Sequence, residues 1–347
     1  VLSVAFYLFF TINNNAYSDT EKTTIIIDLN SQSYPVKNHL FGNNIQWPDK
    51  GDHLLDDSNN RFNQSRLALI KKTKPTTLRF PGGLHADVYH WREGVGERTK
   101  RIPGKHYFSA QKVPSLFGTD EFLKLCKILD CQPIITVNIA TGTPQEAANW
   151  VVYVNKMVKK VGCPEVLFWE IGNEQYLNNK EIRLTPVEYQ KKYLSFASAI
   201  KKVDKEIKLG ALVVDRGTDG VFENAYSQSW NRTILSKKNS SLIDYLCIHN
   251  AYAPGPIPAV KGDKKKLFKT VFKTVDRIEE DYQYLQKLWK GISPKPVKIA
   301  LTEYNTFLVL KSPIAVILLL WGAVSISPSF CICLLSHPLL PQQTTGL

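Results

Sequence analysis

Short apolar runs alternate with longer amphipathic segments along most of this chain, and this alternation restricts the fold more than any other feature. The strand candidates are rich in Ile, Val, Leu or Phe and lie at 40–46, 76–81, 133–140, 165–172, 208–214, 244–250 and 297–303. The helix candidates lie at 61–73, 119–130, 144–161, 185–204, 219–236 and 267–290. Repeats of a strand and a helix at this spacing are typical of a parallel sheet, and their number indicates an α/β fold, the (β/α)8 TIM barrel. A doubly wound open sheet is the alternative, but no Gly-rich phosphate loop follows the first strand.

The composition changes after Asn305, where an eighth strand is expected. Residues 306–347 contain one lysine and no acidic residue, and they follow no helical period. The segment 314–335 is apolar enough to suggest a membrane span, but Pro328 would interrupt a single helix. We therefore favour aberrant sequence, such as a misread exon, over a membrane span. In either case the barrel is expected to be incomplete at its C-terminal end, with the eighth strand missing or replaced.

The N-terminal residues suggest export. The chain opens with the apolar run VLSVAFYLFF, which is followed by small residues placed as in a signal-peptide cleavage site. We predict a signal-peptide remnant at 1–18, an extended segment at 19–39 and the barrel at 40–305. Glycosylation sequons point the same way and begin at Asn63, Asn231 and Asn239. The protein is therefore expected to be a secreted, extracellular glycoprotein.

The formal net charge of the chain is +13, which suggests acidic surroundings or an acidic partner such as an anionic polysaccharide. The lysines are scattered, apart from the run KGDKKK at 261–266, which we interpret as a solvated basic surface. No zinc-finger, helix-turn-helix or RNP-type signature accompanies the charge. We therefore expect no nucleic-acid partner, and the sequence does not indicate an oligomeric state.

Four cysteines lie in the body of the chain, namely Cys126, Cys131, Cys163 and Cys247. None has the spacing of a zinc site, and no other ligand cluster or phosphate loop is visible, so no metal or organic cofactor is expected. Export would permit disulfides, and four thiols allow three complete pairings among which the sequence does not choose. Cys247 lies in an apolar, strand-like run and is expected to be a buried thiol.

Polar residues gather where the predicted strands end, which is where a barrel of this kind places its chemistry. Glu174 follows the fourth strand and Glu303 ends the seventh, and these two strands face each other across a closed barrel. Two carboxyl groups on either side of a cavity are what cleavage of a glycosidic bond requires, one of them protonated and the other ionised. Arg79, at the end of the second strand, could hold one of them ionised by charge pairing.

Three further residues belong to this predicted cluster. His249 and Tyr252 follow the sixth strand, next to the seventh, and could donate hydrogen bonds to the same carboxylate. Glu170 lies four residues before Glu174, so in a regular strand its side chain would point into the barrel. A buried carboxylate there needs a partner, which the sequence does not identify. A single Glu at a strand end is usually a solvated loop residue, so the prediction depends on the coincidence of all these positions.

These motifs resemble those of secreted α-L-arabinofuranosidases and related retaining (β/α)8 glycoside hydrolases. The resemblance runs from about Phe41 to Asn305 and is carried, in order, by FGNNIQW, LRFPGG, YHWREGVG, GTDEFLKLCKILDCQPIITVNIATGTPQEAANWVVYVN, WEIGNEQ, DYLCIHNAY and LTEYN. The GNE triplet alone is moderately specific, whereas its combination with a Glu on the seventh strand is a strong signal. The resemblance implies a barrel enzyme that hydrolyses glycosides in polysaccharide by double displacement, without a cofactor.

The resemblance also implies a role for each matching residue. Glu174 corresponds to the general acid/base and Glu303 to the nucleophile. The residues expected to contact the sugar or the nucleophile are Asn173 at the sugar 2-hydroxyl, Arg79 and Tyr252 at the nucleophile, Trp91 in the sugar pocket, and His249, Asn44 and Gln46 beside them.

The chain departs from the arabinofuranosidase pattern at several places. Gln46 stands where these enzymes commonly have Glu, and Leu84 stands where they have Asn, so the sugar specificity is open. Nothing after Asn305 resembles their C-terminal β-sandwich, which is therefore expected to be missing or replaced. Three alternatives remain: a hydrolase of an acidic polysaccharide in the same clan, a non-catalytic carbohydrate-binding remnant, or a membrane-anchored carbohydrate-binding ectodomain.

Overall fold

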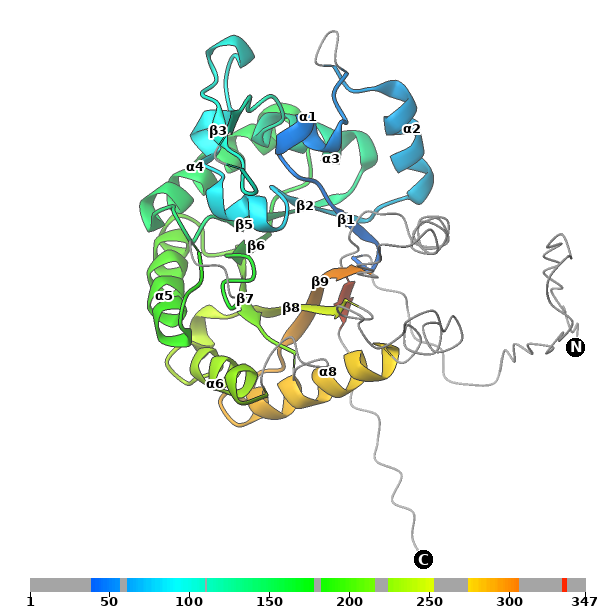
Figure 1. The fold of residues 1–347 in the computed structure, drawn as a ribbon. Coiled ribbons are helices and arrows are strands. Elements are labelled where there is room, and N and C mark those ends of the chain that lie inside the picture. The colour runs from blue at the N-terminus through cyan, green and yellow to red at the C-terminus, as the bar shows by residue number, and fades with distance from the viewer. Residues whose placement is uncertain are drawn as a thin grey trace, which may run out of the picture. The chain divides into compact units, whose positions relative to one another are not determined.

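The fold is a nearly closed barrel of parallel strands with helices around it. The computed structural model describes residues 39–56, 61–109, 111–177, 182–215, 224–252, 274–305 and 333–335. The parallel strands in this part of the chain are β1 (Gly42–Asn44), β2 (Thr77–Phe80), β5 (Gln132–Val137), β6 (Phe168–Ile171), β7 (Lys208–Val213), β8 (Tyr245–Tyr252) and β9 (Lys298–Asn305). Each strand overlaps one predicted strand, and they pair in chain order. The predicted TIM barrel is confirmed. Figure 1 shows the ring of strands face-on, with the helices around it.

Helices connect the strands and cover the outside of the ring (Figure 1). The α-helices are α1 (Pro48–Asp52), α2 (Gln64–Thr73), α3 (Thr119–Leu129), α4 (Pro144–Val161), α5 (Pro186–Val203), α6 (Asn224–Ile234) and α8 (Thr274–Lys290). Between β2 and α3 lie three 3-10 helices (Leu84–Val88, Trp91–Gly94 and Arg98–Lys100) and the hairpin of β3 (Gly104–Lys105) and β4 (Lys112–Val113). The side chains of Thr143 and Thr185 cap α4 and α5 by accepting hydrogen bonds from backbone N–H groups of the first turn.

The eighth position of the sheet is occupied by a replacement strand. β10 (Cys333–Leu335) comes from the atypical C-terminal segment and pairs with β9 in the antiparallel direction, with Cys333 opposite Leu301. An eighth strand of a regular (β/α)8 barrel would run parallel to its neighbours. At the other edge, the Asn44 side-chain amide of β1 donates to the Thr302 carbonyl of β9 over 3.3 Å. Strands β1 and β9 therefore lie near each other even though β10 does not close the ring in the regular way.

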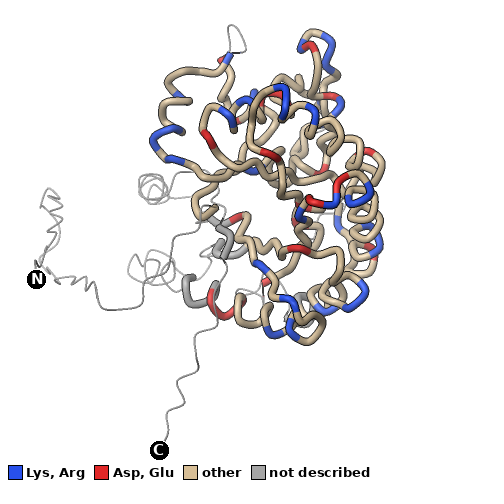
Figure 2. Tube along the Cα trace, turned by 180° about the vertical axis from the view of Figure 1, so that it is seen from behind, with Lys and Arg blue, Asp and Glu red and all other residues tan. Residues whose placement is uncertain are grey.

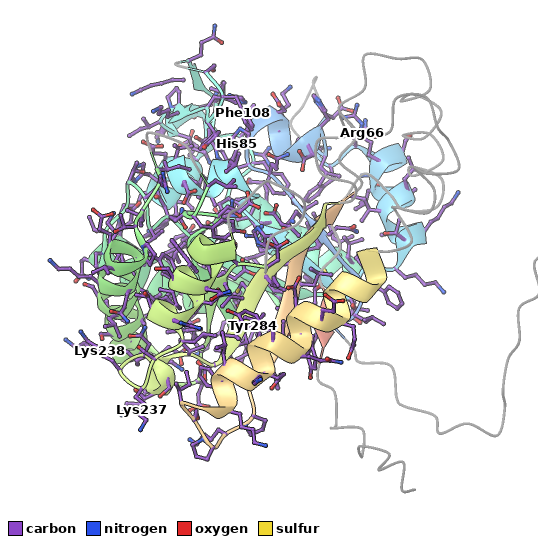
Figure 3. All side chains as sticks on the ribbon, turned by 60° about the horizontal axis from the view of Figure 1, so that its bottom comes forward. Arg66, His85, Phe108, Lys237, Lys238 and Tyr284 are labelled. Atoms are coloured by element: carbon purple, nitrogen blue, oxygen red, sulfur yellow. The ribbon has the colours of Figure 1, made fainter. Side chains whose placement is uncertain are left out.

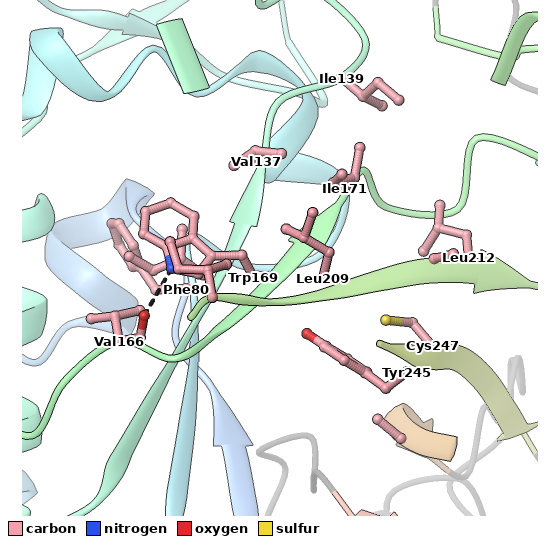
Figure 4. Packing of buried hydrophobic residues seen from close by; sticks show 14 of the residues in the cluster. Phe80, Val137, Ile139, Val166, Trp169, Ile171, Leu209, Leu212, Tyr245 and Cys247 are labelled. Atoms are coloured by element: carbon pink, nitrogen blue, oxygen red, sulfur yellow. Dashed lines mark hydrogen bonds between the residues drawn. The ribbon is translucent and has the colours of Figure 1, made fainter. Parts of the chain in front are cut away.

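Buried and half-buried aromatic side chains pack on both faces of the barrel wall. On β6, Phe168 contacts Tyr245 of β8 with ring centroids 5.9 Å apart. The next residue, Trp169, points to the opposite face, contacts Trp150 of α4 edge-on and donates from its indole nitrogen to the Val166 carbonyl (Figure 4). This alternation is the period-two pattern of a strand that is buried on both faces. Full burial of a Phe-sized side chain contributes about 1.5–3 kcal/mol relative to exposure.

The four cysteines in the body of the chain are all free and buried. Cys247 is fully buried on β8, as predicted, and a Cβ added to Gly210 of β7 would come within 2.4 Å of its Sγ. Burial next to Glu170 raises the pKa of the Cys247 thiol well above its usual range, because the thiolate would be desolvated beside a carboxylate. The thiol is therefore a packing group of the barrel interior.

Two of the three sequon asparagines are buried. The Asn231 side chain bonds to both the N–H and the C=O of Val214, and the Asn239 amide donates to the Ile234 carbonyl. A glycan on either amide nitrogen would have no room in this buried position. Asn63 is partly exposed and caps α2 by accepting from the Arg66 N–H, so burial argues against glycans at two of the three sites.

The surface charge has no single focus in the described residues. Lys and Arg are spread over the outer helices and loops (Figure 2). The KGDKKK run and most of the predicted 314–335 segment lie outside the described residues. Among the helices that the structure describes, none combines the length and the hydropathy needed to cross a bilayer.

Candidate active site

Four neighbouring or facing strands bring the predicted polar residues together at their carboxyl ends. β2 contributes Arg79, β8 contributes His249 and β9 contributes Glu303, which is opposite His249 in the strand register. β6 contributes Glu170 and leads directly into Asn173 and Glu174. Because parallel strands of a barrel end on the same side, residues far apart in the sequence meet there.

Arg79 is at the centre of the cluster and is fully buried. Its Nε donates to Glu170 Oε2 over 2.6 Å, and its Nη1 donates to Glu303 Oε1 over 2.7 Å. Nη2 donates to Asn173 Oδ1 at 2.9 Å, and Nη1 also lies 3.2 Å from Asn44 Oδ1. Burial alone would lower the pKa of the guanidinium, but Glu170 and Glu303 outweigh it and raise the pKa above its ordinary value. The site therefore holds a permanent positive charge between two carboxylates.

Arg79 is the partner of Glu170 that the sequence did not identify. Glu170 also accepts a hydrogen bond from the Thr136 hydroxyl of β5 at 3.1 Å. Together these contacts compensate a carboxylate that is fully buried in the barrel interior. Its role in this arrangement is to fix the position of Arg79.

His249 lies between the two predicted catalytic carboxyl groups. Its Nδ1 is 2.9 Å from Glu174 Oε1 and 3.8 Å from Glu303 Oε2. Burial lowers the pKa of His249, but the nearby Glu303 and the hydrogen bond with Glu174 outweigh this effect, so the pKa is raised. The imidazole thus responds to the charge of both carboxyl groups.

The backbone is shaped to let these groups approach. Gly83 follows β2, and a Cβ added there would lie 3.1 Å from Glu303 Oε1, so a side chain at this position would crowd the carboxylate. Glu174 has φ +52°, in the left-handed region that residues with a Cβ seldom adopt. Gly172, two residues earlier, has φ +90°. The chain therefore turns sharply as it leaves β6, and the turn carries Glu174 to the site.

Glu174, His249 and Glu303 also form the one group of described residues whose donor atoms are close enough to hold a metal ion, since these atoms lie within 4.8 Å of one another. The Arg79 guanidinium bonds directly to Glu303, and a fixed positive charge at that distance repels a cation. The guanidinium therefore makes this cluster less favourable for a cation than three acidic or imidazole groups alone would be.

Some of the other predicted sugar-binding residues contact this cluster directly. Asn173 and Asn44 both contact Arg79, and the Asn173 side-chain nitrogen has no hydrogen-bond partner in the described part of the chain. That nitrogen is therefore a donor available to a ligand. Tyr252 ends β8 opposite Asn305, and its side chain lies outside the described part.

Gln46 and Trp91 have partners outside the carboxylate cluster. The Gln46 amide donates to Asp52 at 3.4 Å and accepts from His85 at 2.7 Å, and His85 packs against Phe108 of the β3–β4 hairpin (Figure 3). Burial lowers the pKa of His85 to about 4, so this imidazole is neutral near pH 7. Trp91 stacks over Trp150 and donates to a backbone carbonyl of α4, so its role in a sugar pocket remains a prediction.

Sequence reasoning did not find Asp87 and Gln175. Both are fully buried, and the Gln175 side-chain amide lies 2.5 Å from Asp87 Oδ1. Burial, and to a lesser degree the charge of Glu174, raises the pKa of Asp87 well above its usual range. The only sequence signal was position, since Asp87 lies shortly after the Pro-Gly-Gly turn and Gln175 follows Glu174.

The chain is similar in sequence to known proteins. The family model of the Alpha-L-arabinofuranosidase 1 domain matches residues 69–232. Alpha-L-arabinofuranosidase C of Emericella nidulans is 35% identical over 172 residues, which are 46% of this chain and 34% of that protein. The chain thus spans about a third of the length of this relative.

Solved structures give the same result for the fold. An alpha-L-arabinofuranosidase from Thermotoga maritima, solved as an arabinose complex, aligns with a TM-score of 0.56 and 25% identity over 80% of this chain and 57% of its own. A family 51 alpha-L-arabinofuranosidase from Bifidobacterium longum aligns with a TM-score of 0.64 at 20% identity, over 76% of this chain and 55% of its own, which bears on the fold alone. The chain is therefore similar to α-L-arabinofuranosidases in sequence over residues 69–232 and has the barrel fold of these solved structures.

Proposed function

We propose that the protein is an exported, retaining α-L-arabinofuranosidase that removes arabinofuranosyl groups from polysaccharide. The observation that carries this proposal is the closeness of the two carboxyl groups, which have oxygen atoms within 4.8 Å of each other. Retaining glycosidases hold their carboxyl groups about 5–5.5 Å apart, whereas inverting enzymes need about 6.5–9.5 Å to admit a water molecule.

The residues support a two-step reaction. In the first step a Glu303 oxygen attacks the anomeric carbon, and the leaving oxygen takes the proton of Glu174. In the second step Glu174 removes a proton from water, and the water oxygen displaces Glu303 with retention of configuration. Arg79 stabilises the ionised form of Glu303, and the Asn173 side-chain nitrogen is placed to donate to a sugar hydroxyl.

Release of nitrophenol from a panel of nitrophenyl glycosides tests the proposal. We expect the α-L-arabinofuranoside to be the preferred substrate and Glu303→Gln to lower kcat by about 10⁴-fold or more, because the nucleophile is lost. Glu206→Gln, which changes an exposed glutamate remote in sequence from the motifs, is the matched control and should leave kcat unchanged. Proton NMR of the first sugar released should show the α anomer, since the configuration is retained.

Other outcomes point to other functions. Preference for a uronic acid glycoside would favour the hydrolase of an acidic polysaccharide, for which the net charge of +13 is the supporting feature. A folded chain that hydrolyses no glycoside would refute the enzymatic proposal and leave a carbohydrate-binding remnant. Export is supported by the leader-like N-terminal sequence, and recovery of the mature protein only from inside cells would contradict it.

A further inference from the structure

The turn that carries Glu174 requires external support. A non-glycine residue with a positive φ persists only where its surroundings fix the backbone, and such residues concentrate at functional sites. The backbone on the far side of Glu174 is tied by two bonds, from Leu177 N–H to the Glu174 carbonyl at 2.8 Å and from Leu184 N–H to the Gln175 carbonyl at 2.9 Å. These bonds hold the chain after the turn but not the side chains on either side of Glu174.

The side chains next to Glu174 are anchored in opposite directions. Asn173, on one side, accepts from the buried Arg79. Gln175, on the other, reaches Asp87 in the segment after β2. The Gln175 side chain also lies over Gly172, where an added Cβ would come within 2.2 Å of its Oε1. Glu174 is thus held between an anchor on the charged Arg79 guanidinium and an anchor on the buried Asp87 carboxyl group.

Asp87 has the environment of a neutral carboxylic acid. It is fully buried, and its Oδ2 has no hydrogen-bond partner among the described residues. A buried carboxylate with a single hydrogen bond is unfavourable, and protonation removes most of the cost. The charged groups that act on Asp87 are Glu174, Arg79 and Lys192, and the first of these opposes its ionisation.

The distance between Asp87 and Gln175 agrees with a neutral acid. A separation of 2.5 Å falls within the range of O–H···O hydrogen bonds and below that of N–H···O bonds. The oxygen and nitrogen of an amide side chain are exchanged by a half-turn, so the Asp87 hydroxyl can donate to the Gln175 carbonyl oxygen. Such a bond links two neutral groups and places no second negative charge beside Glu174.

We propose that protonated Asp87 and Gln175 form a positioning pair that holds Glu174 in the geometry needed for proton transfer. The inference rests on the proposed glycosidase function. Asp87 and Gln175 act through Glu174 and are not assigned contact with the substrate. Loss of the pair should therefore slow the steps that need the acid and leave attack by Glu303 largely intact.

Leaving-group dependence tests the pair. We expect Gln175→Met and Asp87→Leu, which keep similar volume without the hydrogen bond, to lower kcat/KM about tenfold for a methyl arabinofuranoside, whose leaving group needs a proton. For the dinitrophenyl arabinofuranoside, whose leaving group departs without one, kcat/KM should change by less than about twofold. Asp87→Asn should restore most of the activity lost in Asp87→Leu, because an amide N–H can replace the hydroxyl as donor.

The controls separate a positioning role from a structural one. Urea unfolding of each variant shows whether it is folded, and Asn155→Leu, which breaks the bond to Asp204 between α4 and α5, is a matched loss of a polar pair elsewhere. An equal loss on both substrates, or no loss on either, would overturn the positioning role. If the Asp87→Asn variant were as inactive as Asp87→Leu, the assignment of Asp87 as a neutral hydrogen-bond donor would be wrong. A wild-type chain that hydrolyses neither substrate would refute the proposed function itself.

Discussion

The barrel interior and its carboxyl-end rim both hold buried glutamates, but in different ways. In the interior, Glu170 lies on the regular strand β6 and bonds to Arg79 and to Thr136. At the rim, Glu174 lies in a left-handed turn, and Glu303 and His249 face it. The partners of Glu170 do not change protonation near neutral pH, whereas His249 can. The interior therefore fixes charge in place, and the rim contains groups able to exchange protons.

Removal of Arg79 should have the largest effect, because this residue serves both regions. Arg79→Met leaves Glu170 and Glu303 without their cation, and breaking a buried ion pair in this way lowers the free energy of unfolding by about 3–5 kcal/mol. Urea unfolding measures this change, and glycosidase activity should be lost with it. Arg92→Met, which removes an exposed arginine over the Trp91 ring, is the matched control and should cost about 1 kcal/mol or less.

A double variant sharpens this prediction. Arg79→Met combined with Glu170→Leu removes both charges of the interior pair, so it should recover part of the stability lost in Arg79→Met alone. A single Arg79→Met variant no less stable than Arg92→Met would show that the interior does not depend on this charge.

Thr136→Val should change the interior alone. It removes one hydrogen bond to Glu170 and should lower the free energy of unfolding by about 1 kcal/mol, with kcat/KM within about twofold of wild type. Chemical unfolding and nitrophenyl glycoside assays measure the two quantities. A large fall in kcat/KM at unchanged stability would contradict the separation of interior and rim.

The smallest expected effect is a pH dependence of stability that comes from the rim. Because the folded-state pKa of His249 is raised above the ordinary value of 6.5, the protonated imidazole stabilises the fold. This stabilisation is fully present below pH 6.5 and is lost as the pH rises through the folded-state value. Unfolding of wild type and His249→Gln should therefore differ most at the acid end of a series from about pH 5.5 to 9.

The same pH series also tests whether the pKa of His249 is raised in the folded state. If the stability difference between wild type and His249→Gln grew as the pH rose, the imidazole would be stabilised in its neutral form, and the assignment of a raised pKa would be wrong. A difference that does not change with pH would mean that His249 contributes by packing alone.

Local sequence patterns were sufficient for the strands, most helices and the two catalytic candidates. Apolar periodicity depends on residues close in the chain, so every strand from β1 to β9 outside the hairpin overlaps a predicted one. Glu174 and Glu303 could be named because each lies near the carboxyl end of a strand, and these strand ends share one side of a barrel. Gln46 and Trp91 were predicted to bind sugar, but their hydrogen-bond partners lie outside the carboxylate cluster. The position of a residue near a strand end does not specify what its side chain bonds to.

The sequence by itself therefore determined the order of strands and helices and the side of the barrel on which the carboxyl groups lie. Only the tertiary structure decided the partners of those groups: Arg79 bonds to Glu170 across 91 residues of chain, and Gln175 bonds to Asp87 across 88. It also placed an antiparallel β10 at the position of the eighth strand, which was expected to be missing or replaced. The physical reason is that secondary structure follows from short-range periodicity, whereas the pairing of buried polar groups depends on which strands become neighbours.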